Sequence, residues 1–245
     1  MKKELWKSKS FEQPNNFPCP KCLIGFLVGA EIIKEMTEDG KYMESVGYPH
    51  GLDNIFAGIL NCNNHLCKHI VSVNGLLISD IQTGYQKPDG EYVEKRLNIF
   101  HPKFFFPNLR IFPLTDDIPK NIFQLIDQSF SLYFVDNNSC ANKIRITIEY
   151  ILDDLKAPKR RKTRKGKIET IPNLHQRIQH FSKKKPRICR LLLALKIIGN
   201  EGSHSINTTV DDVLTAFEIL ELLVEMIYIK NDNRIETLVK QIIIK

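Results

Sequence analysis

The N-terminal half of the chain alternates short runs of β-branched and aromatic residues with turn-forming residues, a pattern typical of β-strands. We predict strands at 26–33, 55–61, 68–78 and 92–98, separated in part by turns at 38–40 and 48–51. The segment 100–113 contains three prolines and five phenylalanines, and repeated proline prevents a helix. We therefore predict an extended connector there, with a domain boundary near Thr115.

From residue 118 onward, apolar residues recur at the spacing of amphipathic helices. We predict a first helix from Pro119, a residue that suits a first turn, to about residue 134. A second helix should be capped by Asn138 or Ser139. Its apolar residues recur every three or four positions and should form one buried stripe: Ala141, Ile144, Ile148, Ile151 and Leu155.

Further helices are predicted at 174–181, at 186–198 with Gly199 as the stop, and at 234–244. Thr209 and Asp212 form a capping-box pattern that opens the longest predicted helix. The apolar face of that helix comprises Val213, Phe217, Leu220, Val224 and Ile227. The chain is therefore predicted to be α+β, with a β module at 1–114 followed by an all-α helical bundle at 115–245.

Composition places the chain among ordinary globular proteins, with 42% apolar and 26% charged residues. The N-terminus lacks the apolar stretch of a secretory signal, and no apolar run approaches the roughly 20 residues of a membrane span. We therefore expect a cytoplasmic protein without a membrane partner. The net charge of +7 is local, because the segment 156–167 carries eight positive charges and no acid, which leaves the remaining residues at −1.

Four of the six cysteines form two close pairs, Cys19 with Cys22 and Cys62 with Cys67. In a reducing compartment such pairs indicate a metal site, and four thiolates complete the tetrahedral shell of a structural Zn²⁺. The 39 residues between the pairs exceed the usual zinc-ribbon spacing, so we predict an inserted hairpin. His65 or His69 in place of one thiolate, or four buried free cysteines, are the alternatives. Cys140 and Cys189 stand alone and are predicted to be core residues.

The segment from residue 112 to about 230 resembles the bacterial family called domain of unknown function 4145. The resemblance rests on the prolines at 113 and 119, the helix 141–149, the segment 196–204 (KIIGNEGSH), and the Asp211-Asp212 helix ending in Met226-Ile227-Tyr228. Members often carry an N-terminal cysteine-rich ribbon. The resemblance thus implies a zinc-ribbon-like β module joined to a helical domain.

That family looks related to the HEPN superfamily of helical bundles, many of which are metal-independent ribonucleases in phage defence, toxin–antitoxin and restriction systems. Their signature is an arginine, often followed by a polar residue, and a histidine four to six residues after the arginine. Here His204 matches the histidine and Asn200 the polar residue, whereas Gly199 occupies the arginine position. The resemblance also implies a homodimer, because the superfamily often builds its site across a two-fold interface.

Whether the chain is an enzyme is left open by Gly199. Metal-free RNA cleavage needs an acid or base, which His204 can supply, and a cation that stabilises charge in the transition state. Lys196 on the same predicted helix, Arg190 or the basic segment can supply that cation. The structural alternative is that Gly199 ends the helix in a left-handed conformation, with Asn200 and His204 bonded to the freed carbonyl groups or to the start of the next helix.

The basic segment 156–167 is predicted to be a loop that contacts a polyanion. It has no interleaved aromatic residues, so such contact would be made to phosphates and would weaken with salt. A solvated loop is the alternative. The residues expected to contact nucleic acid are Lys159, Arg160, Arg161, Lys162, Arg164, Lys165 and Lys167.

Three functional hypotheses follow. The first is a non-catalytic bacterial defence or restriction protein that engages nucleic acid, RNA by the resemblance, or a defence-system protein partner. The second is a metal-independent endoribonuclease that uses His204. The third is a structural assembly subunit.

Overall fold

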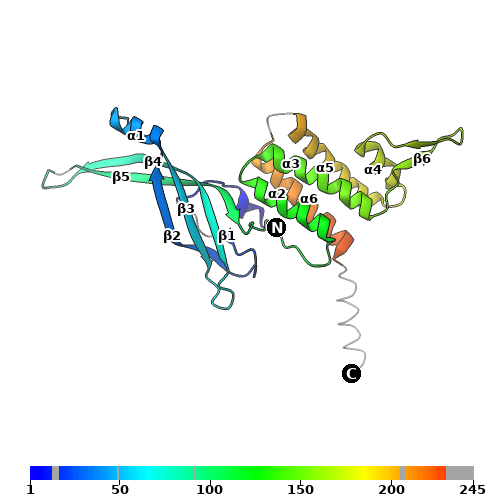
Figure 1. Ribbon diagram of the computed structural model, residues 1–245, viewed down its shortest axis with the longest axis horizontal. Helices are drawn as coiled ribbons and strands as arrows, with labels where there is room; N and C mark the ends of the chain where they lie inside the picture. The colour runs from blue at the N-terminus through cyan, green and yellow to red at the C-terminus, as the bar shows by residue number, and fades with distance from the viewer. Residues whose placement is uncertain (13–16, 49, 91, 205–207, 230–245) are drawn as a thin grey trace, which may run out of the picture. The chain divides into compact units, whose positions relative to one another are not determined.

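The computed structural model describes residues 1–12, 17–48, 50–90, 92–204 and 208–229. The chain divides into two compact units, one comprising Lys2–Arg110 and the other Ile111–Lys245 together with Met1. We call them the sheet unit and the helical unit. The mixed α+β composition expected from the sequence is confirmed, with an antiparallel sheet in the N-terminal part and helices in the C-terminal part (Figure 1).

The sheet unit begins with a short 3₁₀ helix, η1 (Lys3–Trp6), and contains a curled five-stranded antiparallel sheet. The strands follow one another in chain order and are β1 (Phe17–Pro18), β2 (Phe26–Met36), β3 (Leu52–Cys62), β4 (Ile70–Gln86) and β5 (Tyr92–Phe106). The predicted runs at 26–33, 55–61 and 92–98 lie within β2, β3 and β5, and the run at 68–78 begins two residues before β4. The runs of β-branched and aromatic residues between turn residues therefore located each long strand.

The predicted connector at 100–113 was wrong in its first half, because β5 continues through Pro102 to Phe106. A proline lacks the N–H that a central strand needs, but it is tolerated in an edge strand. β5 is the last strand in the sheet order, and its register with β4 shifts between Asn74 and Gly75, next to the pairing of Gly75 with Pro102. Edge position and register shift together explain why these prolines did not end the strand.

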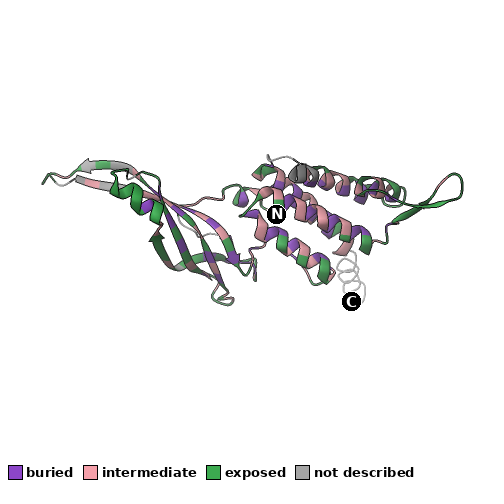
Figure 2. Cartoon of the chain, turned by 45° about the horizontal axis from the view of Figure 1, so that its top comes forward, coloured by how far each residue is buried: buried purple, intermediate pink, exposed green. Residues whose placement is uncertain are grey.

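One face of the sheet carries the core of this unit. Along β3, Leu52, Phe56 and Leu60 are buried, whereas the intervening Ile55 and Ile59 are exposed. The N-terminal segment adds aromatic rings to the buried side, where the Phe17 ring lies edge-on to Phe105 at 5.1 Å between centroids. The opposite face of β3 remains open among the residues that the structure describes (Figure 2).

The predicted turn at 38–40 is instead the start of a helix, α1 (Glu38–Ser45). Thr37 caps it by accepting a hydrogen bond from the Gly40 N–H at 3.1 Å. Gly40 packs tightly, since a Cβ atom there would lie 2.5 Å from the Asp53 carbonyl oxygen. The glycine that suggested a turn is therefore required for close packing of α1 on β3.

The helical unit contains α2 (Lys120–Tyr133), α3 (Asn137–Asp154), α4 (Leu174–Ser182), α5 (Pro186–His204) and α6 (Val210–Tyr228). Pro119 is the N-cap of α2, and the predicted cap of α3 was wrong. Asp136 occupies that position and accepts a hydrogen bond from the Ser139 N–H at 2.6 Å. The apolar stripes are confirmed, because nearly all their members are buried: Ala141, Ile144, Ile148, Ile151, Val213, Phe217, Leu220 and Val224.

The core of this unit is rich in aromatic rings. Phe112, Phe130 and Phe217 contact one another with centroids 5.0 to 6.3 Å apart, and Tyr133 is fully buried beside them. The predicted capping box that opens α6 is present, with Thr209 and Asp212 bonded reciprocally. None of the helices among the described residues is long and apolar enough to cross a bilayer. The helix predicted at 234–244 lies outside the described residues.

The prediction that Gly199 ends a helix was wrong, since α5 continues through it to His204. Gly199 lies where α5 packs against α3: a Cβ atom would come within 2.6 Å of the Arg145 Cβ and 3.1 Å of the Ala141 carbonyl oxygen. The glycine therefore permits close approach of two helices, and the left-handed cap does not occur at this position.

Candidate functional site

The four paired cysteines converge at one end of the sheet. The sulfur atoms of Cys19 and Cys67 lie 3.8 Å apart, those of Cys22 and Cys62 lie 3.7 Å apart, and all four lie within 4.8 Å of one another. Four sulfurs at the Zn–S distance of about 2.3 Å around a tetrahedral ion would be about 3.8 Å apart. No disulfide joins them. Their spacing therefore suits a metal ion that all four thiolates share.

Backbone conformation brings each pair together. Leu23, which follows Cys22, and Lys68, which follows Cys67, have positive φ angles of 56° and 48°. The N–H of Leu23 bonds to the Cys19 carbonyl at 3.0 Å, and the N–H of Lys68 bonds to the Asn64 carbonyl at 3.1 Å. Two similar turns thus orient the second cysteine of each pair toward the first.

The segment between the pairs contains the predicted insertion, formed by β2, α1 and β3. β2 and β3 are adjacent and antiparallel, so Leu27 at the start of β2 lies opposite Cys62 at the end of β3. The two cysteine turns therefore meet at the same end of the sheet. The Asn63 side-chain oxygen accepts a hydrogen bond from the Phe26 N–H at 2.9 Å and links the turns. Antiparallel pairing therefore makes distant cysteines neighbours.

Gly25 is required at this site. A Cβ atom on Gly25 would lie 2.7 Å from the Cys62 Sγ and 2.9 Å from the Asn63 side-chain oxygen. Its N–H also points at the Cys22 Sγ, 3.4 Å away. The glycine thus leaves room for one sulfur and donates a hydrogen bond to another.

The pKa values of the thiols differ with their surroundings. Hydrogen bonds from the backbone N–H groups of Gly25 and Ile24 lower the pKa of Cys22 to about 6. Burial raises the pKa of Cys62 to about 12 and also raises that of Cys19. Desolvated thiolates need a nearby positive charge, which a metal cation bound by the four sulfurs would supply.

Neither predicted histidine alternative belongs to the cluster found among the described residues. Burial, followed by the charges of Lys21 and Arg110, lowers the pKa of His69, whose backbone carbonyl accepts a hydrogen bond from the Cys62 N–H. Cys140 and Cys189 are buried within α3 and α5, as predicted for core residues.

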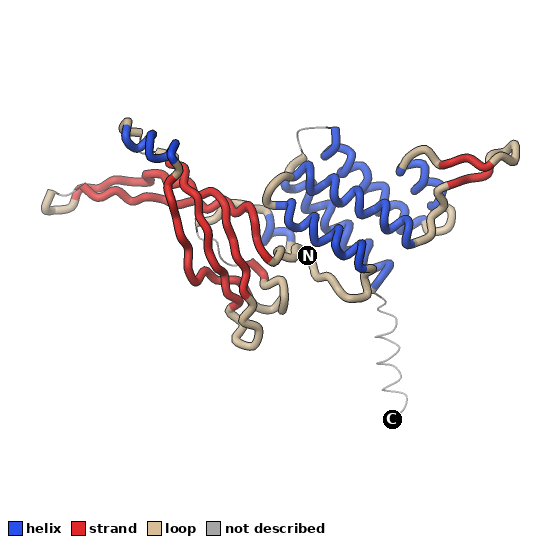
Figure 3. Tube along the Cα trace, in the orientation of Figure 1, coloured by secondary structure: helices blue, strands red, loops and turns tan. Residues whose placement is uncertain are grey.

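The basic segment is not a loop, which corrects the prediction. It forms a hairpin of β6 (Arg160–Lys162) and β7 (Ile168–Thr170), extending from the helices in Figure 3. Gly166, with φ of 80°, allows the tight turn in which its N–H bonds to the Thr163 carbonyl. The Thr163 hydroxyl accepts a hydrogen bond from the Lys167 N–H. All six strand residues are exposed, so the hairpin presents its side chains to solvent (Figure 2).

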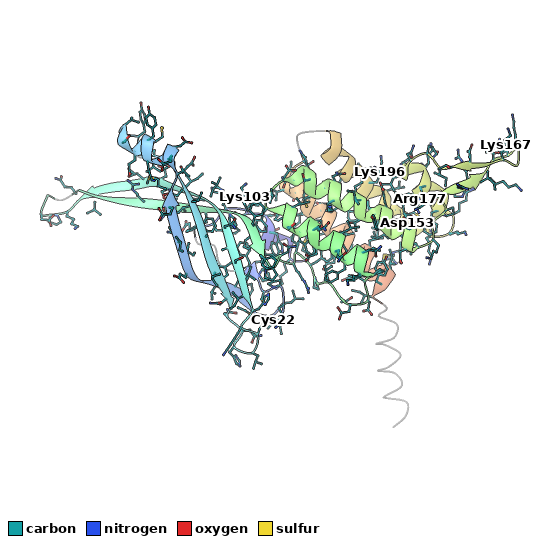
Figure 4. The ribbon with its side chains drawn as sticks, in the orientation of Figure 1. Cys22, Lys103, Asp153, Lys167, Arg177 and Lys196 are labelled. Atoms are coloured by element: carbon teal, nitrogen blue, oxygen red, sulfur yellow. The ribbon has the colours of Figure 1, made fainter. Side chains whose placement is uncertain are left out.

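Ion pairs connect the base of this hairpin to the helices. Asp153 at the end of α3 accepts hydrogen bonds from the Lys159 Nζ at 2.9 Å and the Arg177 guanidinium at 2.6 Å. Arg177 also donates to the Ala157 carbonyl. Burial raises the pKa of Asp153, but the bonds and charges of Lys159 and Arg177 outweigh it and lower that pKa overall. Figure 4 shows Asp153 and Arg177 near each other and Lys167 at the hairpin end.

The predicted catalytic residues all lie on α5. Lys196 is half-buried on this helix (Figure 4), and the backbone helix includes Asn200 and His204, whose side chains lie outside the described residues. Arg145 of α3 was not among the predicted site residues; its Cβ atom lies against Gly199, and its guanidinium pairs with Glu149 at 3.4 Å. No sequence signal identified it, because its proximity to position 199 arises only from helix packing.

Comparison with known families gives two matches. Residues 127–243 match the family model described as Domain of unknown function (DUF4145), which confirms that part of the resemblance. Residues 8–105 match a second model, Domain of unknown function (DUF8608), and this range contains the four clustered cysteines. No curated protein and no solved structure matches the chain significantly.

Proposed function

We propose that this chain is a nucleic-acid-binding protein in which the β6–β7 hairpin contacts phosphate groups and a zinc-ribbon-like site stabilises the sheet unit. The observation that carries the proposal is the ordered, solvent-exposed hairpin in the segment that carries the chain's excess positive charge. A concentrated basic surface attracts polyanions, and phosphate contacts with lysine and arginine dominate nucleic-acid affinity. The setting we propose, bacterial defence or restriction, follows from the resemblance of the helical unit to HEPN-like proteins.

The ion we propose for the cysteine cluster is Zn²⁺, held by Cys19, Cys22, Cys62 and Cys67. Thiolate ligands in tetrahedral geometry favour zinc, and four protein ligands leave no open position for a substrate. The ion would therefore be structural: it would neutralise the buried thiolates and join the two cysteine turns. The chemistry toward nucleic acid would come from the helical unit.

Binding of fluorescently labelled nucleic acids to the full chain, measured by anisotropy over a range of salt concentrations, tests the proposal. We expect affinity for at least one class among single- and double-stranded DNA and RNA, falling steeply with salt. Arg164→Glu with Lys165→Glu should abolish binding, because both charges lie in the hairpin turn. The control is Lys120→Glu with Lys143→Glu, which makes the same charge change on α2 and α3.

Binding to none of the four nucleic acids by the zinc-loaded chain would overturn the proposal and favour a protein partner or a structural subunit. Equal loss of affinity in the hairpin variant and the control would also overturn the hairpin's role. A homodimer remains a prediction of the resemblance.

A second candidate function is metal-independent RNA cleavage, favoured by the position of Arg145. Its Cβ atom lies where a side chain at position 199 would point. In this alternative its guanidinium, which pairs with Glu149 at 3.4 Å, would supply the cation of the related signature. In this alternative His204 acts as the acid or base and Asn200 and Lys196 assist it. Cleavage of labelled RNA in chelator by the wild-type chain, lost in His204→Ala and in Arg145→Ala, would make it the primary function.

A further inference from the structure

The β6–β7 hairpin has two chemically different faces. In an antiparallel ribbon, directly opposite residues share a face and successive residues alternate between faces. Arg160 lies opposite Thr170 and Lys162 opposite Ile168, so these four residues share one face. Arg161 lies opposite Glu169 on the other face. We call the first the open face and the second the paired face.

The charges on the paired face are neutralised within the chain. The Arg161 Nε donates to the Glu169 carboxylate at 2.7 Å. Lys159 lies two residues before Arg161 and therefore on the same face, and it pairs with the Asp153 carboxylate at 2.9 Å. Asp153 also accepts from Arg177, so this side of the hairpin is joined to α3 and α4. Cations already paired with carboxylates have less electrostatic energy to gain from a phosphate.

The open face and the turn carry the available charge. Among the described residues, no acid lies within ion-pair distance of the cations at 160, 162, 164, 165 and 167. The same face presents the apolar side chain of Ile168, which is 73% exposed. An ordered face that combines cations with one exposed aliphatic side chain suits a ligand in which phosphate groups flank the edges of apolar bases.

The shape of the hairpin selects among nucleic acids. The B-DNA major groove, about 12 Å wide and about 8.5 Å deep, admits a two-stranded ribbon. The two strands of a ribbon lie about 4.8 Å apart, which is less than the width of the groove. Three paired residues extend about 10 Å, which is close to the depth of the groove. A-form RNA has a deep, narrow major groove that does not admit such an element. Single strands are bound chiefly by stacking on aromatic rings, and the hairpin has none.

We propose that the open face of the β6–β7 hairpin enters the major groove of double-stranded DNA. Arg160 and Lys162 then contact the groove and its flanking phosphates, the turn cations contact phosphates, and Ile168 packs against base edges such as the thymine methyl. The inference rests on the proposed nucleic-acid-binding function and specifies its ligand and contact face. The paired face orients the ribbon and makes no nucleic-acid contact.

The test compares two double variants of the full chain that remove the same charge from the same arm of the hairpin, residues 159–162. Arg160→Gln with Lys162→Gln alters the open face, and Lys159→Gln with Arg161→Gln alters the paired face. The probes are a 20-base-pair DNA duplex, the corresponding RNA duplex, and the single strands of each. Anisotropy titrations at several salt concentrations give the affinity and the slope of its logarithm against the logarithm of salt concentration.

We expect the DNA duplex to bind most tightly, and the open-face variant to lower its salt slope by about 2 and its affinity at 0.1 M salt by roughly 10- to 100-fold. The paired-face variant should change the slope by less than about 1. Equal losses in the two variants would overturn the face assignment. Tighter binding of RNA or of single strands would overturn the DNA inference while leaving the proposed function intact, and binding of no probe would remove both.

Discussion

The two units of this chain are stabilised in different ways. The helical unit has a closed aromatic core, in which Phe112, Phe130 and Phe217 contact one another, so burial of apolar surface is a main source of its stability. The sheet unit buries one face, leaves Ile55 and Ile59 exposed on the other, and brings four thiols together at one end. The difference teaches that a single chain can combine a unit with a closed apolar core and a unit whose loops converge on four thiols that can share a metal ion.

The tight turns of the two units also differ in the residues that adopt positive φ angles. The cysteine turns use Leu23 and Lys68 in a left-handed conformation that non-glycine residues rarely adopt, and they direct sulfurs inward. The basic hairpin uses Gly166, which adopts that conformation readily, and directs its charges outward. Non-glycine residues in that region cost free energy, which thiolate–metal bonds can offset.

Removal of the proposed zinc ion should produce the largest effect, and it should destabilise the sheet unit without changing the stability of the helical unit. Structural zinc binds small domains with an apparent free energy of about 10–16 kcal/mol, comparable to the total stability of a domain. In chelator, or in Cys22→Ser with Cys62→Ser, we expect amide exchange in β2 and β3 to accelerate strongly. Exchange in α3 and α6 should stay unchanged.

Hydrogen exchange with mass spectrometry on the full chain, beside elemental analysis for zinc, measures both expectations. Cys189→Ala, a buried cysteine of α5 outside the cluster, is the control and should retain one zinc per chain. If the amides of the sheet unit exchanged equally slowly with and without metal, an ion would not be what stabilises this unit.

Gly199→Arg should produce the second-largest effect, and this substitution should destabilise the helical unit while leaving the sheet unit unchanged. It introduces an arginine at position 199 but places a Cβ atom 2.6 Å from the Arg145 Cβ, so overpacking should destabilise the helical unit by about 1–3 kcal/mol. Ile197→Arg introduces the same residue two positions earlier, where the side chain is 56% exposed, and should change stability by about 0.5 kcal/mol or less.

Urea unfolding followed by helical circular dichroism gives the two stabilities, and zinc content should be normal in both variants. If the two arginine variants were equally stable, close packing of α3 and α5 would not be the reason for the glycine.

Asp153→Asn should produce the smallest effect, confined to the base of the hairpin. The pKa of Asp153 is lowered in the folded chain, so its ion pairs stabilise above the unfolded pKa of about 4 and are lost as the pH falls through the folded value. At pH 7 we expect the variant to lose about 1 kcal/mol or less, because the carboxylate is 45% exposed.

The measurement is NMR of the backbone amides from 159 to 171 over a pH titration. Wild type and variant should differ at pH 7 and converge below the folded pKa. A difference that persists unchanged at low pH would show that the carboxylate charge is not the cause.

Local chemistry made much of the fold predictable. The strands followed from runs of β-branched and aromatic residues between turn residues, the Thr209–Asp212 capping box from three-residue spacing, and the cysteine cluster from two close pairs. The errors came from residues that serve tertiary packing. Gly40 and Gly199 resembled breaks in the sequence, yet each lies in a helix where a neighbouring backbone or side chain leaves no room for a Cβ atom.

The sequence by itself determined the periodic elements, the local concentration of positive charge and the residue types of the metal cluster, because these depend on neighbours along the chain. Only the tertiary structure decided that the basic segment is a ribbon with an open and a paired face. It also decided that Arg145 lies against Gly199. These features depend on strand register and helix packing, which join residues through space and leave no periodic trace in the sequence.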